Sequence, residues 1–455
     1  MAEATVPSDF DSQKKADEID AAYRVSDGCY LIGSLERGVT VYNQQVRAHN
    51  LAWALWERRG TNPIRSVAIV GGGIAGLTVA ACILARFDAS TKVTLFERLW
   101  DLDPLQQGAD GRWLHPRIYD WPQYGSRAPG ASLPVLNWSE GRASDVARTL
   151  LASFGKFCST FAADAGRLTV FLGLQNFQLD VARKQIDYVA TRTVREGAHF
   201  HLDRREGRST PFDCIIIACG FGLETATSPF PFTSYWRNEQ LGQPLLDGSQ
   251  RRYLVSGFGD GALVDLCRLT VERFRQDTIL YELFGRRLES LEETLQIELD
   301  RLGKGANIYD FLVKSEDELF AEARREISNR IRKDTSVVLH LRGRDGNIKK
   351  ISDIFGPTSS ILNRLMTFLL FRSGGFSLNF QELEKAVATT GIPTENVLCR
   401  YGANTLGHLQ DMIADYDAVK ARLLEMKEKR EQLPRRLWHP GAFPSPEQQR
   451  GLENG

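Results

Sequence analysis

Residues 66–98 read SVAIVGGGIAGLTVAACILARFDASTKVTLFER. The stretch begins as a continuous apolar run, passes through three glycines into a longer apolar run of helical length, and ends in a second short apolar run. Strands that are apolar at successive positions are typical of parallel sheets covered by helices on both faces. The stretch therefore predicts a βαβ unit and an α/β fold.

The glycines of this unit have the spacing G-x-G-x-x-G, at Gly71, Gly73 and Gly76. In dinucleotide-binding folds the first glycine permits a tight turn, the second lets the backbone approach a pyrophosphate, and the third lets helix and strand pack closely. Glu97 ends the second apolar run, near the spacing at which a carboxylate binds the adenosine ribose. The residues expected to contact a dinucleotide here are Gly71, Gly72, Gly73, Ile74, Ala75, Gly76, Glu97 and Arg98.

Several further strands are predicted after a helix at about 143–166, and they form a small β-meander. The last of them, residues 213–220, reads DCIIIACG. With this strand the chain resembles the FAD domain of two-dinucleotide-binding-domain flavoproteins, the group that contains flavin monooxygenases and pyridine-nucleotide-dependent flavin reductases. Those proteins follow a meander with an acid, an apolar run and Ala-Thr-Gly, and Cys219 stands here in place of the threonine. The resemblance implies FAD at the first glycine turn, with Ala218 and Gly220 beside it.

A second glycine motif lies in residues 253–266, YLVSGFGDGALVDL, where Gly257, Gly259 and Ala262 match the G-x-G-x-x-A variant. Residues 277–284, DTILYELF, are predicted as the returning strand, with Glu282 as its acid. The resemblance implies that this unit binds NADH or NADPH, which reduces the flavin.

Two other interpretations of the second motif stay open. Gly259 and Asp260 can be the late Gly-Asp element of a single FAD domain, which leaves no nicotinamide site, or the motif can be a structural turn. Glu282 disfavours a 2′-phosphate, so the choice between NADH and NADPH depends on whether nearby arginines bind one. Those arginines are Arg275, Arg286 and Arg287.

The loop at 101–142 is long and rich in Gly, Pro, Trp and Asp, which is typical of a segment that covers a ligand. Within it His115 can move a proton, Arg117 can bind a phosphate or carboxylate, and Tyr119 can stack on a ring. A structural, proline-pinned loop is the alternative. His408 is a fourth candidate, placed near the flavin edge if the late helix closes the FAD domain.

The charge balance excludes several classes of partner. The 57 lysines and arginines balance the 57 aspartates and glutamates, so no net field attracts nucleic acid or an anionic membrane. Seven scattered cysteines without a C-x-x-C pair predict reduced thiols and neither a disulfide framework nor a metal site. We expect a cytoplasmic protein that acts on a small-molecule substrate, and a homo-oligomer is left open.

The predicted architecture is a Rossmann-like FAD-binding domain with an inserted β-meander, a second Rossmann-like domain and a helical region. We expect an FAD-dependent oxidoreductase, in the first instance an NAD(P)H-dependent monooxygenase. The alternatives are an FAD oxidase or dehydrogenase without a nicotinamide site, and a dinucleotide-binding sensor or scaffold. The expected segments are a disordered 1–25, an FAD domain at 26–250, an NAD(P) or substrate domain with charged helices at 251–350, a helical part closing the FAD domain at 351–425, and a flexible tail at 426–455.

Overall fold

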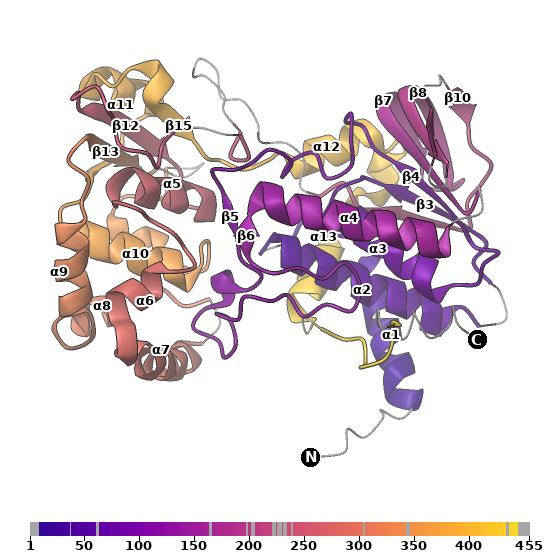
Figure 1. Ribbon diagram of the computed structural model, residues 1–455, viewed down its shortest axis with the longest axis horizontal. Helices are drawn as coiled ribbons and strands as arrows, with labels where there is room; N and C mark the ends of the chain where they lie inside the picture. Colours follow the sequence, from indigo (N-terminus) through magenta and orange to yellow (C-terminus); the bar gives the residue numbers. More distant parts are fainter. Residues whose placement is uncertain are drawn as a thin grey trace.

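The computed structural model contains two large sheets, each covered by helices (Figure 1). The structure describes residues 9–444 except 37, 61–62, 163–165, 197–198, 202–204, 221–223, 225–229, 231–233, 238–239, 304, 343–345 and 434–435. The elements of the second sheet lie at one end of the molecule, on the left of Figure 1, and those of the first sheet at the other end. The predicted α/β class is confirmed.

The first sheet has nine strands in the order β1-β2-β11-β3-β4-β7-β8-β10, with β9 on β8. Its central strands β2, β11, β3, β4 and β7 are parallel, and the meander strands are antiparallel. The strands are β1 (Arg24–Ser26), β2 (Cys29–Leu31), β3 (Ser66–Val70), β4 (Lys92–Phe96), β7 (Leu168–Asp180), β8 (Gln185–Glu196), β9 (His199–His201), β10 (Arg205–Arg208) and β11 (Cys214–Ile217).

Helices cover both faces of this sheet, which explains why its central strands are apolar at every position. On β3, Val67 and Ile69 point into the core shared with α2, α3 and α4, whereas Ala68 and Val70 point into the core shared with α12 and α13. The helices are α1 (Asp9–Tyr23), α2 (Val41–Arg58), α3 (Ile74–Arg86), α4 (Ala143–Phe161), α12 (Thr405–Met412) and α13 (Tyr416–Gln432).

The second sheet has four parallel strands in the order β14-β13-β12-β15, the strand order of a doubly wound fold. The strands are β12 (Arg251–Ser256), β13 (Thr335–His340), β14 (Ser377–Asn379) and β15 (Val397–Cys399). The helices are α5 (Asp260–Thr270), α6 (Ile279–Phe284), α7 (Leu288–Leu302), α8 (Tyr309–Lys314), α9 (Ala321–Asn329), α10 (Ile361–Arg372) and α11 (Leu383–Thr390). Short helical turns are η1 (Ile118–Asp120), η2 (Gly285–Arg287), η3 (Glu316–Phe320), η4 (Ile351–Ile354) and η5 (Thr394–Asn396).

The predicted loop at 101–142 is irregular in the structure. It contains the two-stranded ladder of β5 (Trp113–Leu114) and β6 (Gly141–Arg142) together with η1. No helix within the described ranges is both long and apolar enough to span a membrane.

The prediction of disorder at 1–25 is wrong for residues 9–25. Ala16, Ile19 and Tyr23 of α1 are buried at helical spacing, and the helix packs against α2 and α13. Residues 1–8 lie outside the described residues. The polar composition of this helix hid a narrow apolar face.

The predicted flexible tail at 426–455 is wrong for its first part. Leu437, Trp438 and Phe443 are buried in the core beside α2, and the backbone N–H of Leu437 donates to Asn50 at 2.9 Å. Residues 445–455 lie outside the described residues.

The prediction of a strand at 277–284 is also wrong, because this segment is helix α6. Its buried residues Ile279, Leu280, Leu283 and Phe284 repeat at the i, i+4 spacing of a helix, and the β-rich composition obscured that spacing.

The prediction that 351–425 closes the FAD domain needs correction too. Strands β14 and β15 extend the second sheet, and α10 packs against α5 and α9. Only α12 and α13 of this region pack against the first sheet. Short strands separated by long insertions have no local signal that says which sheet they join.

Candidate functional site

A cavity of about 1610 Å³ lies between the two sheets and is lined by both glycine turns. From the first sheet it is bordered by residues that follow β3, β4 and β11, and from the second by residues that follow β12, β13 and β15. In open α/β sheets, ligands bind outside the carboxyl ends of the parallel strands. The cavity therefore occupies the expected ligand position of both sheets at once.

The first glycine turn has the geometry that its spacing predicts. Gly71 has φ +111°, and a Cβ atom there would lie 2.6 Å from the carbonyl oxygen of Ala218. A Cβ atom on Gly76 would overlap the carbonyl oxygen of Gly71, so helix α3 crosses the turn in close contact. A Cβ atom on Gly73 would meet no described atom within 4 Å. The turn is closed on its packed side and open toward the cavity.

Glu97 lies at the end of β4 and holds this turn together. Its carboxylate accepts hydrogen bonds from the backbone N–H groups of Gly72 and Leu99, both at 2.6 Å. Burial raises the pKa of Glu97. Each carboxylate oxygen has a further lone pair, so the same group can also accept hydrogen bonds from a ribose.

Most residues expected at the first turn line the cavity. They are Gly71, Gly73, Ile74, Ala75, Glu97, Arg98, Ala218 and Gly220. Gly72 and Gly76 are not among the described lining residues, because they pack on the protein side of the turn.

Asp103 was missed in the sequence. Its side chain lines the cavity although the residue is only 2% exposed, and its backbone N–H donates to the carbonyl of Gly72 at 2.9 Å. Burial, with the nearby carboxylates of Glu97 and Asp101, raises the pKa of Asp103 to about 8. Asp103 belongs to no motif, and only the path of the loop brings it to the turn.

Asp103→Asn is expected to flatten the pH dependence of stability of the FAD-free protein. The folded carboxyl holds its proton up to about pH 8, whereas an ordinary aspartate loses it near 3.8. Between these values the folded state binds more protons, so the free energy of unfolding falls as pH rises. Asparagine removes this cost and tolerates the positive φ of the site.

Urea unfolding at about pH 5 and about pH 8.5 measures this effect, and the variant should gain more than about 1 kcal/mol relative to the parent at the higher pH. Asp300→Asn, on an exposed face of α7, is the control and should show the same change in the free energy of unfolding between the two pH values as the parent. If Asp103→Asn also showed the parent's change, the prediction would be contradicted.

The second glycine turn repeats the design of the first. Gly257 has φ +129°, and a Cβ atom there would lie 2.6 Å from the carbonyl oxygen of Arg400. A Cβ atom on Gly259 would meet no described atom within 4 Å, and α5 starts at the next residue.

The first residues of α5 are fixed by contacts within the second half of the protein. The carboxylate of Asp260 accepts hydrogen bonds from the backbone of Ser360 at 2.8 Å and from Asn363 at 2.6 Å. Ala262 is buried against Gly257.

Strand β12 belongs to the second sheet. This placement does not fit the interpretation of Gly259 and Asp260 as the late Gly-Asp element of one FAD domain, which needs the strand in the first sheet.

The acid predicted for the second unit is misplaced. Glu282 lies on α6, forms an ion pair with Arg330, and is not among the described residues that line the cavity. The three arginines proposed beside it are also not among the described residues that line the cavity, and two of them are paired, Arg275 with Asp277 and Arg287 with Glu322.

The strands next to β12 are β13 and β15, and β13 starts more than 50 residues after the segment that was expected to be the returning strand. His340 ends β13, and both His340 and Arg342 line the cavity. Arg342 forms an ion pair with Glu382.

Three of the four catalytic candidates line the cavity: His115, Tyr119 and His408. Nδ1 of His115 accepts hydrogen bonds from the backbone N–H groups of Arg117 and Ile118, at 3.1 and 3.0 Å, which gives this ring a role in shaping the loop. Burial lowers the pKa of His115 and of His408. Arg117 is not among the described lining residues and pairs with Asp120.

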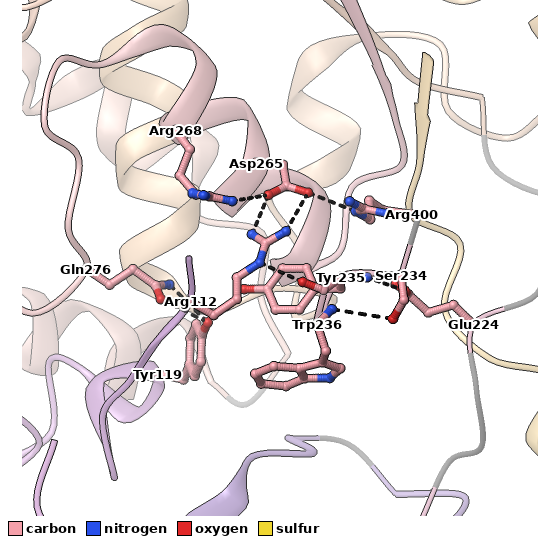
Figure 2. Close-up of polar contacts among 10 residues, drawn as sticks. All are labelled: Arg112, Tyr119, Glu224, Ser234, Tyr235, Trp236, Asp265, Arg268, Gln276 and Arg400. Atoms are coloured by element: carbon pink, nitrogen blue, oxygen red, sulfur yellow. Dashed lines mark hydrogen bonds and ion pairs between the residues drawn. The ribbon is translucent and has the colours of Figure 1, made fainter. Parts of the chain in front are cut away.

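A buried ion cluster joins the two halves beside the cavity (Figure 2). Asp265 on α5 accepts hydrogen bonds from Arg112 at 2.5 Å and from Arg400 at 2.8 Å, and Arg268 lies 3.4 Å away. Arg112 comes from the loop after β4, and its guanidinium also lies 3.7 Å from the ring centroid of Tyr235. Burial alone would raise the pKa of Asp265, but Arg112 and Arg400 outweigh it and hold the pKa at about 2.

Comparison with known proteins identifies no family for this chain. No protein-family model and no curated protein sequence matches the chain significantly. Among solved structures, the polycyclic ketone monooxygenase of the thermophilic fungus Thermothelomyces thermophila is similar over 74% of this chain and 45% of that chain, with 12% identity and a TM-score of 0.22. The match thus spans less than half of the fungal enzyme.

Proposed function

We propose that the protein is an FAD-dependent oxidoreductase in which NADPH reduces the flavin. The observation that carries the proposal is the single cavity onto which both glycine turns open. Sites for one drug-sized ligand usually measure about 300–1,000 Å³. The 1610 Å³ cavity therefore leaves room for more than one such ligand.

The residues of the first turn fit FAD. Gly73 leaves the start of α3 open, so backbone N–H groups and the helix dipole can receive a pyrophosphate. Glu97 lies where it can accept the ribose hydroxyls, and Ala218 and Gly220 border the same space. When bound, FAD supplies the hydride acceptor; the protein's groups bind it, orient it and exclude water.

The residues of the second turn fit a nicotinamide dinucleotide. Gly259 leaves the start of α5 open to the cavity, as Gly73 does for α3. The end of β13 lies where the ribose selectivity group of such a unit stands, and Arg342 provides a guanidinium there for a 2′-phosphate. We therefore favour NADPH over NADH.

The use of the reduced flavin is proposed to be hydroxylation of a small molecule with oxygen. All seven cysteines are free and scattered, and Cys219 is the one within the described cavity lining. This arrangement supports a monooxygenase over a disulfide reductase.

The visible absorbance spectrum before and after anaerobic NADPH or NADH addition tests the proposal. We expect bound flavin that NADPH bleaches more readily than NADH. Arg342→Ala should raise the NADPH concentration for half-maximal bleaching about tenfold, equivalent to about 1.4 kcal/mol, and leave NADH unaffected. Arg286→Ala, an exposed arginine outside the described cavity lining, is the control.

Flavin that stays oxidised with both nucleotides would overturn the nicotinamide site and favour an oxidase or a sensor. Protein that fails to bind FAD after reconstitution would overturn the proposed function as a whole.

A further inference from the structure

Three polar side chains form a hydrogen-bonded chain beside the second glycine turn. Oγ of Ser256, at the end of β12, lies 2.6 Å from Nδ1 of His340, at the end of β13. The same oxygen lies 2.5 Å from the hydroxyl of Tyr401, which follows β15. Nε2 of His340 lies 2.8 Å from the carbonyl oxygen of Gln381. All three side chains line the cavity.

The direction of this chain follows from the carbonyl of Gln381. A carbonyl only accepts, so Nε2 of His340 carries a proton, and in the neutral ring Nδ1 is then an acceptor. Ser256 must donate its one proton to Nδ1. Tyr401 must therefore donate to Ser256, and its hydroxyl proton is used within the protein.

The burial of the chain is graded. Ser256 is 1% exposed and His340 4%, whereas Tyr401 is 48% exposed. Tyr401 is therefore the most exposed of the three residues toward the cavity. A change of protonation at the histidine would thus reach the cavity through Tyr401.

The surroundings keep His340 neutral in the ligand-free protein. Burial lowers its pKa most strongly, and the carbonyl of Gln381 acts in the opposite direction. Of the charged groups facing it, Arg342 on its own segment lowers the pKa, while Glu382 and Glu384 raise it. At the other end of the hydrogen-bonded chain, burial raises the pKa of Tyr401 most strongly, and Cys399 on β15 and Glu384 both raise it too.

We propose that a pyrophosphate bound at the second glycine turn reverses the donor–acceptor direction of these hydrogen bonds, with uptake of one proton by His340. The protonated Nδ1 then donates to Ser256, Ser256 donates to Tyr401, and the hydroxyl of Tyr401 donates to a phosphate oxygen. One proton comes from solvent, and no covalent bond other than O–H or N–H changes. The ligand's identity as a dinucleotide rests on the proposed function.

The reversal provides both a donor and a charge. Hydrogen bonds in which one partner is ionised are roughly twice as strong as neutral ones. The anion also favours the charged imidazole, since an opposite charge nearby raises the pKa of histidine. Anion binding therefore raises the pKa of His340, and protonation of His340 strengthens anion binding.

Isothermal titration calorimetry of the full-length, FAD-loaded protein with ADP-ribose tests the proposal. This probe carries the pyrophosphate but no hydride and no group that titrates near neutral pH. Titrations run in buffers of different ionisation enthalpy, from about pH 6 to about pH 8.5, on both sides of an ordinary histidine pKa. We expect uptake approaching one proton per molecule bound, and affinity that falls by up to about tenfold per pH unit as pH rises.

The variants separate the members of the chain. His340→Asn should abolish proton uptake, and Ser256→Ala should reduce it because the link to Tyr401 is cut. Tyr401→Phe should weaken binding at the low end of the pH range about tenfold and have little effect at the high end. Tyr124→Phe, a fully exposed tyrosine that is not among the described lining residues, is the control.

Binding by the parent protein without proton uptake, or uptake that persists in His340→Asn, would overturn the proposal. If NADPH bleaches the flavin while ADP-ribose binds without proton uptake, the proposed function stands and the proposed reversal of the hydrogen bonds is wrong. If ADP-ribose binds with proton uptake but NADPH leaves the flavin oxidised, the phosphate site stands and the reductase proposal falls. If ADP-ribose does not bind, the pyrophosphate site itself is overturned.

Discussion

Asp265→Ala is expected to lower the free energy of unfolding by about 3–5 kcal/mol, because it removes the one carboxylate from a buried ion cluster. Asp265 is fully buried and contacts Arg112 and Arg400, which are themselves buried. Without the carboxylate these two guanidinium groups would remain out of water without the anion that offsets their charge. Urea denaturation at neutral pH, followed by circular dichroism, measures the loss.

The low pKa of Asp265 also predicts that the contribution of this cluster to the free energy of unfolding is lost in acid. The folded pKa of Asp265 is about 2, below the ordinary 3.8, so the group's contribution is complete above about pH 4 and is lost as pH falls toward 2. Asp265→Ala should therefore approach the parent's stability at low pH.

Asp300→Ala on the exposed face of α7 is the matched control and should change stability by less than about 0.5 kcal/mol. A loss at Asp265 no larger than that of this control would contradict the buried-cluster account.

Gly76→Ala is expected to lower FAD affinity at least about 100-fold, equivalent to about 2.7 kcal/mol. The new methyl group would overlap the carbonyl oxygen of Gly71, so helix α3 must move away from the turn. That movement displaces the backbone N–H groups that the pyrophosphate needs. Fluorescence titration of the FAD-free protein with FAD measures the affinity.

Gly155→Ala is the matched control. Gly155 lies within helix α4, and a Cβ atom there would meet no described atom within 4 Å. Alanine is favoured over glycine in a helix by up to about 1 kcal/mol, so this variant should keep FAD affinity and gain slight stability. Unchanged FAD binding in Gly76→Ala would remove the first turn from the cofactor site.

The elements around the two glycine turns were predictable from the sequence. Strands β3, β4 and β12 and helices α3 and α5 lie where the apolar runs and the glycine spacing place them. Each pattern depends on residues that are neighbours along the chain, and the backbone needs of a tight turn restrict the choice to glycine.

The wrong predictions concern segments whose apolar pattern is weak in the sequence or whose structure depends on residues far away along the chain. The segment of Glu282 has β-rich composition, but its apolar spacing is helical and tertiary packing makes it a helix. Helix α1 is largely polar, and the segment around Trp438 is rich in proline and follows a highly charged stretch, so a few buried side chains decide the order of both.

The sequence by itself determined an α/β fold with two glycine turns, each between a buried strand and a helix, because these features depend on local spacing. Only the tertiary structure decided that both turns face one cavity and that β13 is the strand beside the second turn. It also decided the partners of Asp265 and the chain from Tyr401 through Ser256 to His340. Ser256 lies 84 residues from His340 and 145 from Tyr401 along the sequence, so no local periodicity reports their contact. Parallel strands bring such residues together at one edge of a sheet, and that pairing exists only once the chain has folded.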